Sequence, residues 1–527
     1  MPKHYVNLDA LIVREDIFSI ANPLRSLSAS TTKSIKINDL TPNGGIFLSL
    51  RKPDFQRETA NWEPEKVVEL VQCFLTGSFI PSIILWLAPD GRIFVIDGAH
   101  RLSALIAWVH DDYGDRQISR KFFNNFIPPG QAKVADKTRK LMDAAVGSYQ
   151  TIMTALANAE HSDPKHVEYG RKSSVFEFYN QWVTGDPSTA EASFKKINQN
   201  ATLIDKTEFQ MIESRKKPNA LAARALIRAG VGHKYWSSFP KPTQERIATI
   251  AKEIYDMLFI PEIDDEYPKT LDLPIAGKGY SAESIKLIFD FVNLANGLVE
   301  TQTKIKLVLD DPDGVETLNY LNKIRRIIAR ICSNDNCSLG LHPAVYFYSM
   351  VGRYQPTAFL AIVSFILELD ENDGYADFTL YRARFEEFLV SHRYFINQIV
   401  NQFGSNFKAQ AWVLRLYKII LNNIRTGAEQ NLVNEIISMK DWRLKELPIP
   451  GSAFSSQAKA AVVLKKSLSS AMKCSICGAR IHRNSMQIDH VVRRQDGGSG
   501  HSDNGDVAHP YCNTGYKEHR HLRSAGQ

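Results

Sequence analysis

The sequence predicts an α+β protein with a mixed α/β N-terminal domain, an all-α middle domain and a small, metal-stapled C-terminal module. Strand and helix patterns alternate early in the chain, helical periodicity dominates residues 240–445, and three of the six cysteines crowd into residues 474–512. At 527 residues the chain also exceeds the roughly 250–300 residues that a single hydrophobic core serves. We therefore expect three domains, over residues 1–235, 236–450 and 451–527.

The first domain is expected to mix strands and helices from about residue 35 to 110. The stretch NWEPEKVVELVQCFLTGS indicates a helix, because Pro64 stands near its start, apolar residues recur on one face and Gly77 ends it. The runs SIILWL and RIFVI flank the turn APDG, which predicts a β-hairpin. The following HRLSALIAWVH has the pattern of a helix.

The middle of the chain carries helical periodicity in nearly every segment, as in SAESIKLIFDFVNLANGLV and TLNYLNKIRRIIARI. Its most apolar run, AFLAIVSFIL, has ten residues, whereas a membrane span needs about 20. We therefore expect a buried helix there. The stretch LKELPIPGSAFSSQ combines prolines, a glycine and serines, and is interpreted as a linker into the last module.

Composition points to a cytoplasmic protein with a basic end. The first thirty residues lack a basic start followed by an apolar signal core, and six cysteines without an export signal fit a reducing compartment. Of the net charge of +7, most lies after residue 450, where eleven Lys and Arg face five Asp and Glu. A compact basic module is typical of proteins that meet phosphate backbones. The alternative is a solvated basic tail.

The C-terminal module contains two closely spaced pairs of soft metal ligands. Cys474 and Cys477 form a Cys-x-x-Cys, and His509 and Cys512 form a His-x-x-Cys further along. Two such pairs suit tetrahedral Zn²⁺, which would staple a small fold. A redox Cys-x-x-Cys is the alternative, but the second pair and the missing βαβ context favour zinc.

Zinc does not explain four polar residues in the same module, Asp489, His490, Asn504 and Asn513. A phosphodiester hydrolase needs a cation against the developing charge and a base that takes a proton from water. Asp489 and Asn513 offer the hard oxygens that Mg²⁺ or Mn²⁺ prefers, and a neutral His490 suits the base. The glycine-rich loop between them lets the chain return, so that Asn504 is expected to hold the imidazole.

Residues 473–520 resemble the HNH endonucleases, a family with a ββα-metal fold, through Cys-x-x-Cys, IDHVV, GG, DNGDVAH and YCN. The resemblance implies that His490 is the general base, that Asp489 and Asn513 bind the catalytic ion and that Asn504 fixes the loop and the base. Asn513 stands where many members have a third His. His509 stands where many have a Cys, which leaves open a catalytic role for it. A zinc-stapled DNA-binding module without catalysis is the alternative.

The stretch IFVIDGAHRLSALIAW predicts a strand, an Asp-Gly turn and a helix start. Amide groups at a helix start carry partial positive charge, and a glycine lets a phosphate approach, so Gly98, His100 and Arg101 are expected beside an anion. In the plainer interpretation Asp97 is a helix cap and Arg101 a surface charge.

Three stretches, PDFQRETANWEPEKVVELV, DGAHRLSAL and FKKINQNATLIDKTEF, occur in this order and resemble the ParB/sulfiredoxin-like domain of GmrSD restriction enzymes and SspE-type defence proteins. The resemblance covers residues 35–235 and implies binding and hydrolysis of a nucleotide, GTP or ATP. The implied pocket residues are Gln56, Arg57, Asp97, Gly98, His100, Arg101 and Asn198. Ala99 and His100 replace glutamines common in that family, which favours binding over turnover.

Together these patterns predict a nucleotide-regulated, metal-dependent DNA endonuclease that acts in defence against phage or foreign DNA. One alternative is a nucleotide-gated DNA-binding or regulatory protein whose HNH module does not cut. Another is an RNase or homing-type nuclease in which the N-terminal domain is only a scaffold. No motif specifies the DNA sequence or base modification, the nucleotide, or association into a homo-oligomer.

Overall fold

The computed structural model describes residues 5–19, 32–200, 206–263, 267–279, 282–298, 308–404, 407–445 and 455–517. The chain divides into two compact units, Met1–Lys216 with Val231–Ser238, and Lys217–Gly230 with Phe239–Gln527. The helical region and the C-terminal module therefore lie in one compact unit. The domain boundaries expected after residues 235 and 450 remain predictions.

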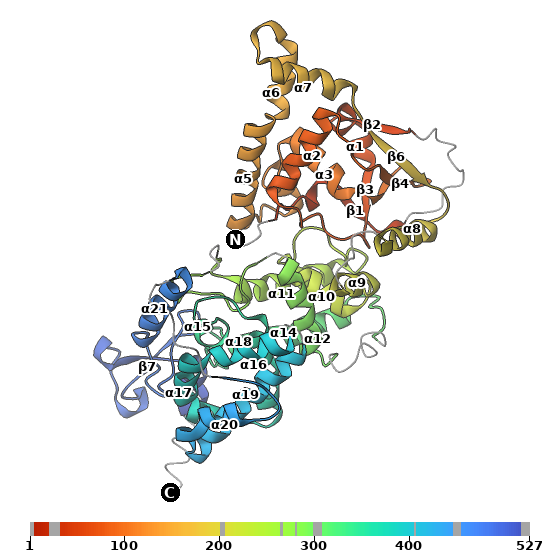
Figure 1. The fold of residues 1–527 in the computed structure, drawn as a ribbon. Helices are drawn as coiled ribbons and strands as arrows, with labels where there is room; N and C mark the ends of the chain where they lie inside the picture. Colours follow the sequence, from red (N-terminus) through yellow and green to blue (C-terminus); the bar gives the residue numbers. More distant parts are fainter. Residues whose placement is uncertain are drawn as a thin grey trace. The chain divides into compact units, whose positions relative to one another are not determined.

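The first unit is built on a six-stranded mixed sheet with the order β1-β3-β5-β4-β6-β2 (Figure 1). Strand β5 pairs in parallel with β3 and antiparallel with β4, while β6 joins β4 in parallel and β2 antiparallel. The strand bounds are β1 Val13–Glu15, β2 Ser34–Lys36, β3 Leu50–Pro53, β4 Ile83–Leu87, β5 Ile93–Asp97 and β6 Glu177–Val183.

Strand β5 is apolar on both faces because both faces of the sheet are covered. Val95 packs into a large core with helices α2 (Pro64–Thr76) and α3 (Ala99–His110), whereas Phe94 and Ile96 pack on the other side, in the core that contains Phe194 of α8. This alternation follows from the two-residue period of a strand. The hairpin and both helices predicted here are confirmed.

Helix α2 ends where the sequence predicts. Gly77 adopts a left-handed conformation with φ of +74°, and its amide donates to carbonyls of the last helical turn. The remaining helices of this unit are α1 Gly45–Ser49, α4 Gln117–Phe122, α5 Pro129–Ala145, α6 Tyr149–Ala157, α7 Pro164–Val175, α8 Pro187–Asn200 and α9 Lys206–Glu213.

The second unit is helical up to the C-terminal module, as expected. Its apolar run 358–367 lies in α16, which is buried among the other helices, and no helix in the described ranges is long and apolar enough to cross a membrane. The helices are α10 Pro218–Ile227, α11 Lys241–Phe259, α12 Ala282–Ala295, α14 Val315–Ile331, α15 Pro343–Tyr346, α16 Pro356–Glu371, α17 Tyr375–His392, α18 Tyr394–Phe403, α19 Phe407–Thr426, α20 Leu432–Ser438 and α21 Ser456–Ser469.

The C-terminal module contains a two-stranded antiparallel sheet followed by a short helical turn. Strands β7 (Gln487–His490) and β8 (Gly505–Ala508) pair along their whole length, and the π-helical turn Cys512–Tyr516 comes next. This is the expected ββ-then-helix order. Residues 446–454 of the predicted linker lie outside the described residues.

Candidate functional site

Four metal-ligand side chains converge in the C-terminal module. Cys474 and Cys477 follow helix α21, while His509 and Cys512 follow strand β8. Their ligand atoms all lie within 4.8 Å of one another, and Cys477 alone among the four is only half-buried. The structure thus brings together the cluster that the sequence predicts.

The distances within this cluster fit tetrahedral zinc. Nδ1 of His509 lies 3.4 Å from Sγ of Cys477 and 3.8 Å from Sγ of Cys512. Ligands bound tetrahedrally at about 2.0–2.3 Å from zinc are separated by about 3.3–3.8 Å. Nε2 of His509 donates to the carbonyl oxygen of Arg480 at 3.0 Å, so Nδ1 presents its lone pair to the cluster. The residues therefore fit a structural Zn²⁺.

The thiols of the cluster are not independent. Hydrogen bonds with Cys477 and Cys512 lower the pKa of Cys474, and the hydrogen bond with Cys474 raises the pKa of Cys477 to about 12. Three thiols this close do not ionise together without a cation. A divalent ion would supply the charge that lets all three bind as thiolates.

Strand β7 carries the predicted metal ligand and base. Asp489 is buried opposite Asp506 of strand β8, and the half-buried His490 lies opposite Gly505. No hydrogen bond from a described residue reaches the imidazole of His490. Its ring nitrogens are therefore available to water or substrate.

Lys517, which was not predicted as a site residue, forms an ion pair with the carboxylate of Asp489. The Lys517 ammonium donates to the two carboxylate oxygens at 2.9 and 2.7 Å, and to the carbonyl oxygen of His490 at 3.0 Å. The carboxylate thus accepts a cation here, as a metal ligand must. In the sequence, Lys517 is one of many basic residues of the module. Its position four residues after Asn513, on the expected helix, could have predicted that it lies near the site.

Asn504 fixes the glycine-rich loop by its side-chain amide. Its Oδ1 accepts from the backbone amide of Val492 at 2.7 Å, and its Nδ2 donates to the carbonyls of Val492 at 3.1 Å and Ser499 at 2.7 Å. In addition, its own carbonyl accepts from the amide of Val491. These bonds hold the chain directly after His490, so that Asn504 is joined to the predicted base through the backbone and not by a contact with its ring.

The side-chain amide of Asn513 is held by a hydrogen bond from its nitrogen. Its Nδ2 donates to Oε1 of Gln487 at 3.0 Å, and the amide of Gln487 donates in turn to Oδ1 of Asn336 at 3.2 Å. No described residue donates a hydrogen bond to Oδ1 of Asn513. The nitrogen is therefore anchored, while the amide oxygen has no partner among the described residues.

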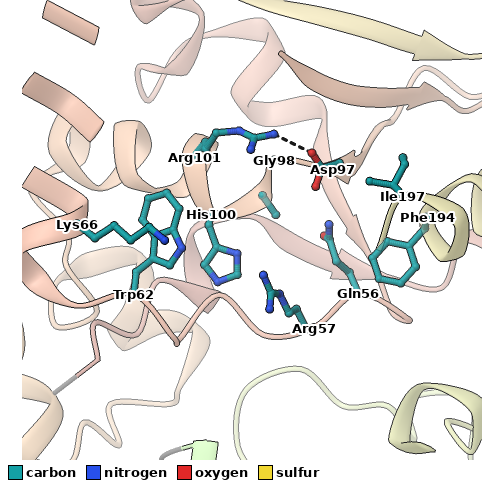
Figure 2. Close-up of a pocket in the computed structure, with 11 residues that line it drawn as sticks. Gln56, Arg57, Trp62, Lys66, Asp97, Gly98, His100, Arg101, Phe194 and Ile197 are labelled. Carbon is teal, nitrogen blue, oxygen red and sulfur yellow. Dashed lines mark hydrogen bonds and ion pairs between the residues drawn. The ribbon is translucent and has the colours of Figure 1, made fainter. Parts of the chain in front are cut away.

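The residues predicted for a nucleotide surround one cavity of about 240 Å³ in the first unit (Figure 2). The members predicted from the sequence are Gln56, Arg57, Asp97, Gly98, His100 and Arg101. Ala99 also lines the cavity, as do Trp62, Lys66, Phe194 and Ile197, which were not predicted. Trp62 and Lys66 are four residues apart, within a stretch that the resemblance covers, and this spacing was an available signal. Asn198 belongs to α8, but its side chain lies outside the described residues.

Gly98 is required where strand β5 turns into helix α3. Its φ is +92°, and a Cβ there would lie 2.5 Å from Cγ2 of Ile83. Gly98 has no side chain, so no capping side chain at this position binds the first amides of α3.

His100 is half-buried and neutral beside this helix start. Burial, and then the nearby charges of Arg57 and Lys52, lower its pKa well below the usual value. Trp62 stacks on its ring with centroids 5.5 Å apart, and the Lys66 ammonium lies 4.9 Å from the Trp62 ring centre. Figure 2 shows Arg57 and His100 extending toward the same space.

Three buried polar atoms of the cavity wall lack a partner among the described residues, Nε2 of His100, Oε1 of Gln56 and Nε of Arg101. A buried polar atom left unpaired costs about 1–3 kcal/mol, so such atoms mark a place where a ligand or water completes the site. Arg101 does not point into the cavity freely, because its guanidinium donates to Asp97 at 2.7 Å and to the carbonyl of Ser82 at 3.2 Å.

The loop that carries Gln56 and Arg57 is held from behind by Arg14. The Arg14 guanidinium donates to the carbonyls of Pro53, Gln56 and Arg57, and it pairs with the buried carboxylate of Asp9 at 3.0 Å. The position of the pocket loop therefore depends on the N-terminal segment.

The comparisons with known families fall on these two sites. Residues 37–223 match the family model described as the GmrSD restriction endonuclease, N-terminal domain, and residues 474–519 match the model described as HNH endonuclease. No curated protein and no solved structure matches the chain. The predicted resemblances to the GmrSD N-terminal domain and to the HNH endonucleases are thereby confirmed. The chain joins a GmrSD-type N-terminal domain to a C-terminal HNH endonuclease domain, and it is a DNA endonuclease of the restriction type.

Proposed function

We propose that this endonuclease is metal-dependent, that a nucleotide in the N-terminal cavity regulates it, and that it acts in the cytoplasm against phage or other foreign DNA. The observation that carries the proposal is the presence in one chain of an HNH domain and of a cationic cavity with unpaired buried polar atoms. Unregulated cutting would damage the host, so a ligand-controlled nuclease is physically sensible.

In the HNH domain, Asp489 and Asn513 would hold Mg²⁺ or Mn²⁺ through their oxygens. The ion, when bound, supplies charge against the negative phosphorane and polarises the scissile phosphate. His490 takes a proton from the attacking water, since its imidazole has no described hydrogen-bond partner. Asn504 keeps the base in place by holding the loop from Val491 onward.

In the N-terminal cavity, the amides at the start of α3 face the phosphates, and Arg57 and Lys66 add positive charge. The neutral His100 and Gln56 offer polar atoms for a base or sugar, and the Trp62 ring provides an apolar wall. Arg101 acts by fixing Asp97 beside Gly98 rather than by direct contact. This combination of charge, stacking surface and polar atoms suits a nucleoside triphosphate. The cavity specifies neither GTP nor ATP.

Regulation requires that the nucleotide bind two states of the protein with different affinity. A nucleotide that binds the cutting-competent state 100-fold more tightly shifts the equilibrium by about 2.7 kcal/mol. The cleavage rate should therefore change with nucleotide concentration and saturate.

Plasmid cleavage tests the proposal directly. The zinc-loaded protein is mixed with supercoiled plasmid, Mg²⁺ or Mn²⁺, and ATP, GTP, CTP or UTP in turn, with phage DNA of modified and unmodified bases as parallel substrates. We expect cleavage that needs the divalent ion, responds to at least one nucleotide and is lost in His490→Ala. Cleavage that is indifferent to every nucleotide and to Arg57→Ala would refute the regulatory part.

A further inference from the structure

The zinc centre is supported by residues that lie outside both family matches. Helix α17 of the helical region presents Arg382 and Glu386, whose side chains are both fully buried. They form an ion pair of 2.9 Å, and Tyr346 donates to the same carboxylate oxygen of Glu386 at 3.1 Å. A buried charge pair of this kind needs further hydrogen bonds to offset its desolvation.

The second carboxylate oxygen of Glu386 makes such a bond, to the backbone of the segment that follows the ligands Cys474 and Cys477. It accepts the backbone amide of Arg480 at 2.9 Å. The carbonyl oxygen of the same residue accepts Nε2–H of His509 at 3.0 Å. A continuous path of buried hydrogen bonds thus runs from Glu386 through one peptide segment to the imidazole that ligates zinc.

Arg382 supports a second backbone segment beside that imidazole. Its guanidinium donates to the carbonyls of Leu339 and Gly340, the latter at 2.9 Å. Gly340 has φ of +62°, and a Cβ on it would lie 2.6 Å from Cδ2 of His509. The loop is therefore held in contact with the ligand ring. Burial lowers the pKa of Arg382, but the negative charge of Glu386, and after it Tyr346 and the thiols of Cys477 and Cys512, raise it above the usual value.

We propose that Glu386 is a positioning residue of the zinc centre, and that the helical region is in this way a structural part of the nuclease. Glu386 fixes the peptide at Arg480, and this peptide sets the orientation and tautomer of His509. Outer hydrogen bonds of this kind change metal affinity by about 10–100-fold. The inference does not depend on nucleotide regulation or on DNA cleavage.

Zinc release from the full chain tests the inference. Zinc loss to a chromogenic chelator is followed at constant temperature for the wild type, Glu386→Gln and the matched control Glu387→Gln. Glu387 is the neighbouring acid and pairs with Nη2 of Arg480 at 2.9 Å, but its side chain is 55% exposed and does not contact the peptide. We expect release about tenfold faster or more in Glu386→Gln, and an unchanged rate in Glu387→Gln.

Cobalt spectroscopy separates positioning from a general loss of stability. In Co²⁺-substituted protein, Glu386→Gln should shift the visible ligand-field bands, while Glu387→Gln should leave them as in the wild type. If Glu386→Gln does not fold, Tyr346→Phe removes one donor to the same carboxylate and should speed zinc loss several-fold. Release rates and spectra equal to the wild type in the folded Glu386 variant, or in Tyr346→Phe when that variant replaces it, would overturn the inference.

Discussion

Replacing Lys517 by Met is expected to tighten the binding of Mn²⁺ at Asp489. The Lys517 ammonium contacts both carboxylate oxygens, and the two side chains are only 17% and 11% exposed. Hydrogen bonds to charged groups contribute about 1.5–3 kcal/mol, and an ion that takes over the carboxylate must replace them. Because about 1.4 kcal/mol corresponds to a factor of ten, Kd should fall roughly tenfold to a hundredfold.

Free Mn²⁺ measured by electron paramagnetic resonance during titration of the zinc-loaded protein, without DNA, gives this Kd. Lys517→Arg retains the charge and should bind Mn²⁺ as weakly as the wild type does. Lys465→Met, on the exposed side of α21, removes a lysine elsewhere in the module and should change nothing. An unchanged or weaker affinity in Lys517→Met would refute the argument that lysine and metal ion compete for one carboxylate.

Three further outcomes are expected. His490→Ala should lower plasmid cleavage by about 100-fold or more without changing DNA binding in a gel-shift assay, and equal cleavage would remove the base assignment. Gly98→Ala should lower Tm and abolish nucleotide binding in calorimetry, whereas Gly91→Ala, at a similar φ of +89° but with open space around it, should cost only the backbone strain of about 1–3 kcal/mol. The depressed pKa of His100 means that the unfolded chain binds a proton near pH 6.5 that the folded chain does not. Stability should therefore fall below that pH by up to about 1.4 kcal/mol per pH unit, and His100→Gln should flatten this slope in denaturant unfolding.

The sequence predicted those elements whose conformation depends on residues close together in the chain. The strand–turn–helix around Gly98 and the stop at Gly77 follow from conformations that favour glycine, and the buried strand β5 follows from its apolar run. The two ligand pairs of the zinc site were also predictable, because one short turn brings the two ligands of each pair together. In contrast, the helical periodicity of the middle region did not predict the division between α17 and α18, which meet at the buried Arg393.

The contacts that the sequence did not predict join segments far apart in the chain. Lys517 reaches Asp489, Arg14 holds the loop at Gln56, and Glu386 binds the peptide of Arg480. Each partner is an ordinary charged residue in its own neighbourhood, and only the fold shows what it contacts. Sequence patterns therefore located both sites but not the residues that support them.

Diffraction from crystals of the protein soaked with Mn²⁺, recorded at the manganese absorption edge, tests the central claim most directly. We expect one manganese peak about 2.1 Å from oxygens of both Asp489 and Asn513, with His490 beside it and Lys517 displaced. A separate zinc signal should lie among Cys474, Cys477, His509 and Cys512. Manganese bound elsewhere, with Lys517 still on the carboxylate, would contradict the proposed cleavage site.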